Sequence, residues 1–557
     1  MKNFRLEYGI MGSAVVLLLG ITAFPMSLVF IQSLFTEYGV FTLDYMHAVF
    51  TDPSNFEAFR NTLTIAFLTV IFTILIATPL AWLVVRTDLP FRNTFRTLFL
   101  VPYMIPPFIG AIAWGFLLAP RTGYFNQWFM TLFDTKEPLF NIYSYWGIVL
   151  VLTFHLFADV FIIVAGALER MDPTLEEAAR SSGAGIFRVM REITIPLVSP
   201  SIGAGAVLVF ITSAANFGIP ALIGMEGRVF VLTTRIVYYI EKGGFTGIQE
   251  ATSLSVLLVL TASIALFINR WYLGKRNYSI IAGKSTTPMQ TKLGKFRIPL
   301  FLLCSAFVLI TVVAPITVIF MISLLKAFGI KFALGNLTLA NYEWILFKSA
   351  YTKASIFNSF VLASSAATIL VLIGSVIAYI LVKTNVKGRQ FLDFLANLPY
   401  SIPGTVVAIA MILAFSGKYG IAIYNTAWIL LVAYVVRYMG FAVKALTASL
   451  EQVHGSLEEA ARISGASWLQ TFRTVILPLV RPGIIAAWFL TFMPILRELT
   501  MSILLYGPNT RTIGVAIFEL QDGGNYCTSA ALASLVLMLI IGGKVIINRL
   551  SGGKFNI

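Results

Sequence analysis

Long apolar segments alternate with short polar ones along the whole chain. Twelve of these segments approach or exceed the length of about 20 residues that a helix needs to cross a bilayer. We therefore predict an all-α membrane protein with about twelve transmembrane helices. The expected spans are 9–33, 60–85, 97–119, 143–168, 198–222, 250–270, 298–325, 357–382, 391–416, 424–448, 481–506 and 527–548.

The composition supports a protein of the lipid bilayer, because 58% of the 557 residues are hydrophobic and only 12% are charged. The net charge is +15, but Lys and Arg lie in the short segments between apolar runs, as the positive-inside rule requires of cytoplasmic loops. We therefore expect both termini in the cytoplasm and no nucleic-acid partner. Two cysteines and three histidines give no pattern of metal ligands, so no metal site is expected.

An internal repeat divides the chain into two similar halves. The sequence Val-Pro-Tyr-Met-Ile-Pro at 101–106 matches Leu-Pro-Tyr-Ser-Ile-Pro at 398–403, and Asn61-Thr62 matches Asn358-Ser359, both at an offset of 297. A later match, of 175–180 with 457–462, has an offset of 282. We predict a duplicated six-helix unit with domains 1–270 and 298–557, joined by a cytoplasmic linker at 271–297. Parallel repeats of this kind enclose a path along their shared axis.

The strongest motif follows the predicted fourth helix of each half. The first copy is Thr-Leu-Glu-Glu-Ala-Ala-Arg-Ser-Ser-Gly at 174–183, and the second is Ser-Leu-Glu-Glu-Ala-Ala-Arg-Ile-Ser-Gly at 456–465. In each copy a proline follows thirteen residues after the glycine, at 196 and 478. We name residues 174–196 the first elbow and residues 456–478 the second elbow.

Capping and turn-forming residues predict two short helices in each elbow. Thr174 and Ser456 are predicted N-caps with a glutamate three residues later, which is a capping box. Glu176 and Arg180 are expected to pair at a spacing of four residues. The glycine supplies a left-handed turn that ends the first helix, and the proline is expected to stop the second one. The alanines permit close approach by a partner.

This pattern resembles the EAA loop of ABC importer permeases, which in that family forms a coupling helix that docks into a groove on the ATPase subunit. The resemblance implies an ATPase-coupling role for the following residues: Glu176, Glu177, Ala178, Ala179, Arg180, Gly183, Pro196, Glu458, Glu459, Ala460, Ala461, Arg462, Gly465 and Pro478. The segments Arg-Glu-Leu-Thr at 497–500 and Leu-Tyr-Gly-Pro at 505–508 also resemble fused permeases of the ferric-iron and thiamine group, whose relatives handle phosphonates or sugar phosphates.

The resemblance implies a non-catalytic membrane subunit that works by alternating access. Its expected partners are two copies of an ATPase subunit, which use ATP and Mg, and an extracytoplasmic substrate-binding protein at a bacterial inner membrane. The chain itself is expected to bind no cofactor. Ala282-Gly283-Lys284-Ser285 resembles the end of a phosphate-binding loop, but Tyr278 occupies the position where that loop needs its first glycine. Ferric iron is the first expectation for the substrate, and an organophosphate, a phosphonate or thiamine is the alternative.

Polar residues inside predicted spans are candidates for a substrate path, because burying a charge in a bilayer is costly. The offset of 282 makes His155 equivalent to Arg437 and Asn216 equivalent to Glu498. The candidates are His155, Asp159, Asn216, Arg437, Arg497 and Glu498. The alternative is that these residues are structural pairs that hold helices together. Two arginines in the spans favour an anionic substrate.

Two other classes of function remain open at this point. A twelve-helix secondary transporter driven by an ion gradient also has parallel repeats, and His155 with Asp159 could relay protons in it. A membrane scaffold or an ion channel is the third possibility, although no segment resembles a repeated selectivity filter. The two elbows favour the importer over both.

Overall fold

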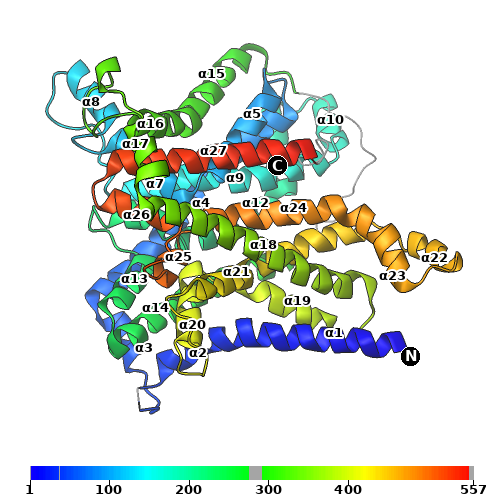
Figure 1. The fold of residues 1–557 in the computed structure, drawn as a ribbon. Coiled ribbons are helices and arrows are strands. Elements are labelled where there is room, and N and C mark those ends of the chain that lie inside the picture. Colours follow the sequence, from blue (N-terminus) through cyan, green and yellow to red (C-terminus); the bar gives the residue numbers. More distant parts are fainter. Residues whose placement is uncertain (1, 37, 275–290, 551–557) are drawn as a thin grey trace. The chain divides into compact units, whose positions relative to one another are not determined.

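The computed structural model describes residues 2–36, 38–274 and 291–550. Over these residues the regular secondary structure is helical, and β pairing is limited to four isolated bridges. The prediction of an all-α protein is confirmed (Figure 1). The central part of the predicted linker, 275–290, lies outside the described residues.

The helices form two compact units, and each unit combines segments from both sequence halves. Unit 1 contains Met1–Val49, Ile236–Val256 and Leu339–Ile557, and unit 2 contains Phe50–Arg235 and Leu257–Thr338. The first helix of each half therefore packs with the later helices of the other half. Three helices cross the boundaries between units: α3 Asp44–Thr51, α13 Leu232–Lys242 and α14 Gly244–Gly274.

Unit 2 is built around three long helices that pack through apolar side chains such as Leu80, Phe157 and Val209. The first two of these helices begin at side-chain caps, where Asp52 accepts from Ser54 N and Ser144 accepts from Gly147 N. The three are α4 Pro53–Arg86, α9 Tyr145–Arg170 and α12 Ile195–Ala214. The other helices of the unit are α5 Arg92–Phe99, α6 Val101–Met104, α7 Pro107–Leu118, α8 Tyr124–Leu132, α10 Thr174–Ser181, α11 Ile186–Val189, α15 Arg297–Val308 and α16 Ala314–Ser323, with the short turns η2 Met190–Thr194, η3 Pro220–Gly224, η4 Gly294–Phe296, η5 Leu309–Val313 and η6 Leu334–Asn336.

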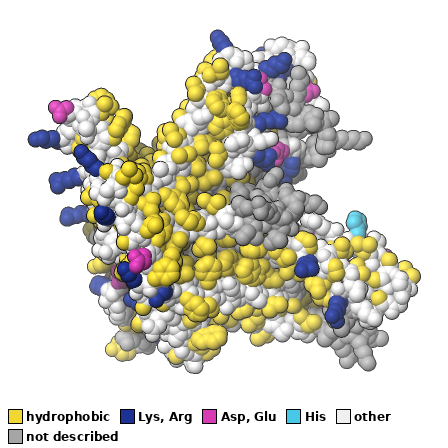
Figure 2. All heavy atoms as spheres, turned by 45° about the horizontal axis from the view of Figure 1, so that its top comes forward, with side chains coloured by type: hydrophobic (Ala, Val, Ile, Leu, Met, Phe, Trp, Pro, Cys, Tyr) yellow, Lys and Arg dark blue, Asp and Glu magenta, His cyan; other side chains and the backbone are white. Residues whose placement is uncertain are grey.

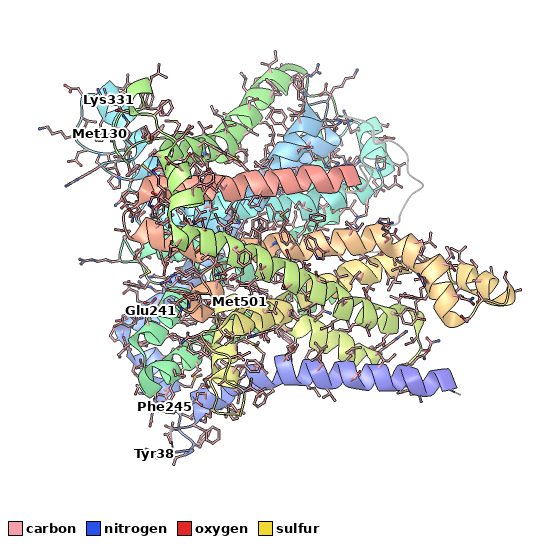
Figure 3. All side chains as sticks on the ribbon, in the orientation of Figure 1. Tyr38, Met130, Glu241, Phe245, Lys331 and Met501 are labelled. Atoms are coloured by element: carbon pink, nitrogen blue, oxygen red, sulfur yellow. The ribbon has the colours of Figure 1, made fainter. Side chains whose placement is uncertain are left out.

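The segment that follows the linker, from Thr291 through α15, packs against α4, α5 and α9 of unit 2. Thr291 N donates to Arg86 O at 2.8 Å, which ties the segment to the end of α4. The ring of Phe307 on α15 then packs edge-on against Phe99 and Phe157, at centroid distances of 5.9 and 5.0 Å. Beyond α16, Tyr124 donates to Ile330 O at 3.5 Å, and Figure 3 shows Met130 and Lys331 in these two neighbouring segments.

Unit 1 repeats this core with three equivalent helices. Ser349 and Thr426 cap the first two, by accepting from Thr352 N and Trp428 N. The three are α18 Ala350–Lys383, α21 Ala427–Glu451 and α24 Leu477–Leu496. The other helices are α1 Lys2–Leu18, α2 Phe24–Leu34, α17 Ala340–Glu343, α19 Arg389–Asn397, α20 Gly404–Phe415, α22 Gly455–Ile463, α23 Trp468–Thr471, α25 Ser502–Leu505, α26 Ile513–Asp522 and α27 Tyr526–Leu550, with the turns η1 Leu19–Ala23, η7 Trp344–Lys348, η8 Leu398–Ser401 and η9 Phe472–Ile476.

The N-terminal helices α1 and α2 belong to this second core. They run beside α19 and α20 (Figure 1), where the ring of Phe24 meets Tyr419 edge-on at 5.4 Å. Tyr8 also accepts from Lys387 N at 3.3 Å. The predicted first span is confirmed as a helix that continues from Glu7 to Leu34.

Among the described residues, ten helices are long and apolar enough to span a membrane. The predicted spans 97–119 and 391–416 are broken rather than straight, and the described residues have up to twelve spans if each broken pair is one. Each is a bent pair, with angles of 100° and 110° between its two parts. The bends lie at the repeated Pro-Tyr-X-Ile-Pro sequence. A proline forces the preceding isoleucine out of the helical region, so Ile105 and Ile402 are extended with ψ of 129° and 136°.

Four spans contain a π-helical turn directly before a proline. The turns η1, η2, η5 and η9 each end two residues before a proline, which is the second residue of the following α-helix. Proline has no N–H and its ring clashes with the carbonyl four residues earlier, so a wider turn makes room for it. The prolines are Pro25, Pro196, Pro315 and Pro478.

Large apolar side chains are exposed along the spans, as a lipid environment requires. Figure 2 shows hydrophobic side chains over most of the face in view, with Lys and Arg side chains mainly toward its margins. Examples are Val16, Phe67 and Leu372, which are 70%, 60% and 65% exposed on α1, α4 and α18. Ten apolar spans with this surface support a multi-pass membrane protein.

Candidate functional site in the two elbows

The first elbow begins with α10 and turns sharply at Gly183. Gly183 has φ of +88°, and its N–H donates to Arg180 O at 2.9 Å. Ala184 N donates to Ala179 O at 3.0 Å, which completes a Schellman motif. The predicted left-handed glycine is confirmed, and α11 starts three residues later, at Ile186.

The second elbow has the same backbone. Gly465 has φ of +83°, and Ala466 N donates to Ala461 O at 3.0 Å. A Cβ at Gly183 or at Gly465 would meet no atom within 4 Å, so only the left-handed φ selects glycine there. The two elbows are therefore equivalent in local structure, although they lie in different units.

The predicted capping boxes are wrong, because the helices begin earlier than the sequence suggests. Thr174 is the first residue of α10, and the carboxylate of Asp172 accepts from its N–H at 2.9 Å. This hydrogen bond lowers the pKa of Asp172 below its usual value. In the second elbow α22 starts at Gly455, so Ser456 lies inside the helix, and Leu457 N donates to His454 O. Asp172 therefore caps the first elbow from a position that the pattern did not single out.

The second helix of each elbow does not end at its proline, which corrects another prediction. In the first elbow helical structure continues from Ile186 to Ala214, through η2 and past Pro196 into the membrane span. In the second elbow it continues through η9 and past Pro478. The wider π-helical turn accommodates the proline ring. Each elbow is therefore a direct extension of a membrane helix, α12 or α24.

A buried arginine connects the first elbow to α4 and α9. Arg86 is 1% exposed, and its Nη2 donates to Leu168 O at 2.8 Å and to Met171 O at 2.9 Å. Its Nε lies 3.7 Å from Glu176 Oε2, and Glu176 Oε1 accepts from Thr194 Oγ1 at 2.5 Å. Glu176 therefore pairs with Arg86 and not, as predicted, with Arg180.

Arg180 instead contacts the segment that follows the linker. Its Nη1 donates to Thr291 Oγ1 at 3.2 Å. Thr291 is already bound to the backbone of Arg86, so the linker end and the first elbow share this anchor. A small pocket lies between them, lined by Trp82, Glu177, Met190 and their neighbours.

The second elbow is connected to α18 through a lysine. Lys383 Nζ donates to Val453 O at 2.8 Å and lies 2.8 Å from Glu458 Oε1. The side chains of Lys383 and Glu458 are 10% and 13% exposed. Lys383 is related to Arg86 by the offset of 297, and Glu458 to Glu176 by 282. The sequence predicts no individual role for either cation, although their equivalence under the repeat was available as a signal.

The outer faces of the elbows remain open. Ala178, Glu459 and Ala460 are exposed, and Glu177, Ala179 and Ala461 are half-buried. Large apolar side chains lie beside them, with Phe187 75% and Ile463 87% exposed. The side chain of Arg462 lies outside the described residues. Alanines flanked by exposed apolar groups form a surface suited to a protein partner.

Two of the predicted path residues form internal hydrogen bonds in unit 1. Arg437 Nη1 donates to Pro399 O, Tyr400 O and Ile402 O, the carbonyls released by the bend before α20. Glu498 accepts from Met501 N, Ser502 N and Ser502 Oγ at 2.6–2.9 Å and caps α25, which starts beside Met501 in Figure 3.

One predicted path residue of unit 2 has a similar use. Asn216, equivalent to Glu498, accepts from Ile219 N at 3.0 Å and so caps η3. His155 and Asp159 are half-buried on α9, and in unit 1 Arg497 is half-buried at the end of α24. Arg437, Glu498 and Asn216 thus each make structural hydrogen bonds, and their place on a substrate path stays a prediction.

The repeated Asn-Thr and Asn-Ser dipeptides act at the opposite end of α4 and α18. Asn61 Nδ2 donates to Phe230 O, and Thr62 Oγ1 accepts from Leu232 N. Asn358 and Ser359 make the equivalent bonds to Arg511 O and Ile513 N. Each dipeptide thus holds the start of a short helix, α13 or α26.

The family model for a binding-protein-dependent transport system inner membrane component matches residues 79–277 and 370–552. The two matches lie in the two sequence halves, and each contains one elbow. The chain belongs to this family. It is therefore an ABC importer permease of the binding-protein-dependent type, with two copies of the family unit in one polypeptide.

Relatives at modest identity include permeases for different substrates. The permease is 27% identical over 466 residues to Ferric transport system permease protein FbpB of Actinobacillus pleuropneumoniae, over 83% of this chain and 66% of that protein. It is 30% identical over 228 residues to Molybdenum transport system permease protein ModB of Escherichia coli K12, over 40% of this chain and 95% of that protein.

A solved bacterial alginate ABC transporter in complex with its pentasaccharide-bound periplasmic protein has a chain 18% identical to the permease. The match covers 47% of the permease and 96% of that chain, with a TM-score of 0.38. This likeness is too distant for a comparison of positions.

Proposed function

We propose that this permease is the membrane subunit of an ATP-driven importer, and that it passes ferric iron inward by alternating access. The observation that carries the proposal is the pair of elbows, which share one backbone and continue directly into α12 and α24. A partner that moves an elbow would also move a membrane helix. Such a partner can bias a membrane domain with two states only through differential binding to them.

The partners of the proposed importer follow from these surfaces. Two copies of an ATPase subunit bind the open faces around Ala178 and Ala460, and they use ATP and Mg. The chain itself binds no cofactor and catalyses no reaction. An extracytoplasmic binding protein delivers the substrate to the opposite side. Both termini and both elbows then lie in the cytoplasm of a bacterium, as the distribution of Lys and Arg predicts.

Ferric iron is proposed as the substrate because three relatives that match over more than three quarters of the chain are named as ferric transport permeases. The earlier preference for an anionic substrate rested on arginines in the spans. Arg437 gives this preference less support, because its guanidinium binds three backbone carbonyls. An organophosphate, a phosphonate or thiamine remains the alternative within the same class.

The test is reconstitution of the purified permease in liposomes with its ATPase subunit and binding protein. We expect the ATPase to copurify with the permease, and we expect ATP-dependent uptake of radiolabelled ferric iron. ATP-dependent uptake of a phosphonate or thiamine in place of iron would reject ferric iron as the substrate. The assignment to the ATP-driven importers would stand. Uptake driven by an ion gradient without any ATPase would reject the proposal in favour of a secondary transporter.

A further inference from the structure

Each elbow is joined to its helix bundle by one buried cation at the end of a long helix. Arg86 is the last residue of α4, and Lys383 is the last residue of α18. Each cation forms an ion pair with a carboxylate of its elbow, Arg86 with Glu176 at 3.7 Å and Lys383 with Glu458 at 2.8 Å. Each also binds the backbone oxygen just before the elbow, at Met171 or Val453.

The arrangement is the same in both units although the sequence spacing is not. The two cations are 297 residues apart, whereas the two carbonyls and the two glutamates are each 282 apart. The difference of 15 residues falls between the cation and its partners. The folded chain nevertheless brings the same three groups together twice, once with arginine and once with lysine.

Burial makes each connection stiff. Arg86 is 1% exposed, and the side chain of Glu176 is 14% exposed. A buried charge that loses its partner is strongly destabilising, because water cannot replace the lost contact. Glu176 therefore cannot move away from Arg86 at low cost, and the first elbow and the end of α4 move together. The same holds for Glu458 with Lys383 on α18.

We propose that Arg86–Glu176 and Lys383–Glu458 are positioning pairs that transmit the movement of each elbow to α4 and α18. The first glutamate of each motif thus faces the permease, and the adjacent Glu177 or Glu459 is left for the ATPase. This inference rests on the proposed function, because it assumes that an ATPase moves the elbows. The pairs would transmit elbow movement to α4 and α18, in addition to its direct transmission through the continuous helices α12 and α24.

The test uses Glu176→Gln and Glu458→Gln, singly and together, in the complex with the ATPase subunit and the binding protein. Glutamine keeps the shape and removes the charge. We expect ATP hydrolysis to continue while uptake of radiolabelled ferric iron per ATP falls about two- to thirtyfold, the range for residues that carry coupling between sites. The matched control is Glu192→Gln, which removes an exposed charge paired with Arg188 in the same elbow. It should keep the wild-type ratio.

A second measurement does not depend on the cargo. Hydrogen exchange at the ends of α4 and α18 is compared with and without ATP. We expect ATP to change the exchange rates there in the wild type and in Glu192→Gln, and to change them less in the glutamine variants. Arg86→Lys and Lys383→Arg exchange the two cations that the chain already uses, so both should behave as the wild type does.

Several results would overturn the inference. In one, the glutamine variants keep both the uptake ratio and the response to ATP. In another, they lower only the melting temperature, which would mean a purely structural role. A third is a loss in Arg86→Lys as large as in Glu176→Gln. If the glutamine variants fail to assemble, Glu176→Asp and Glu458→Asp replace them with the same expected direction. A wild-type permease that binds no ATPase would instead reject the proposed function.

Discussion

The two units repeat one design but stabilise it with different chemistry. Both elbows end their first helix with a left-handed glycine, at +88° and +83°. The first elbow is held by an arginine with two carbonyl contacts and by Thr194 and Thr291. The second elbow is held by a lysine with one carbonyl contact. The repeated motif therefore sets the backbone of an elbow, and residues outside the motif set how firmly it is held.

The bends differ in the same way. In unit 1, Arg437 binds three carbonyls released at the bend before α20. The equivalent residue in unit 2 is His155, a smaller group with fewer donors. A duplicated fold can thus keep its geometry while its two copies come to depend on different side chains.

The largest expected effect is at Arg437. Arg437→Met leaves three carbonyls without their donor inside the protein, and we expect a loss of about 3 kcal/mol or more in unfolding free energy. Thermal unfolding of the purified protein in detergent measures it. Arg481→Met, at an exposed position on α24, is the control and should change little. Equal losses in the two variants would contradict a special role for the bend.

The next effect compares the two buried cations. Arg86→Met should lower the unfolding free energy by about 3 kcal/mol and Lys383→Met by about 1–2 kcal/mol, because the arginine satisfies one more carbonyl and is more deeply buried. Thermal unfolding under matched conditions gives both values. A larger loss for Lys383→Met would contradict the prediction that the first elbow is held more firmly than the second.

The elbow glycines should respond equally. Gly183→Ala and Gly465→Ala force a left-handed alanine, which costs about 1–2 kcal/mol, in open space that adds no clash. Gly185→Ala is the control, since Gly185 has φ of −69° and also has open space around it. Differential scanning calorimetry should show equal losses at positions 183 and 465 and none at 185. Unequal losses would mean that the two backbones are not equivalent.

A smaller effect should be confined to the first elbow. Thr291→Val removes the acceptor for Arg180 but keeps the backbone bond to Arg86, so we expect a loss of about 0.5–1.5 kcal/mol. Hydrogen exchange should rise in residues 174–183 and stay constant in residues 456–465. A change in the second elbow would show that the linker end acts beyond its own unit.

The smallest effect is a dependence on pH at the first elbow. Hydrogen bonds from Thr174 lower the pKa of Asp172. The carboxylate therefore stabilises the fold above its ordinary pKa near 3.8, and this contribution is lost as the pH falls through the lowered value. Asp172→Asn should melt lower than the wild type at pH 6, and the difference should shrink toward pH 3. His454 holds the equivalent position in the second elbow, so His454→Asn should not show this trend.

Sequence by itself determined the features that depend on local length and local chemistry. Runs of apolar residues set the number and type of the spans, because every backbone group in lipid must be satisfied within its own helix. The two glycines of the elbows were found because a left-handed turn is a local requirement. The repeat gave the equivalence of Arg86 with Lys383 and of Asn216 with Glu498.

Only the tertiary structure decided which of these residues meet. Glu176 had a plausible partner four residues away, but the fold places it beside the buried Arg86 instead. The sequence identified no partner for Arg437, but the bend at Ile402 exposes carbonyls that its guanidinium binds. The first helix of each half packs into the core that the other half forms, which is distant from it in the sequence. A buried charge or apolar face is stabilised by any group that packs against it in the fold. The separation of the two groups along the chain does not affect this stabilisation.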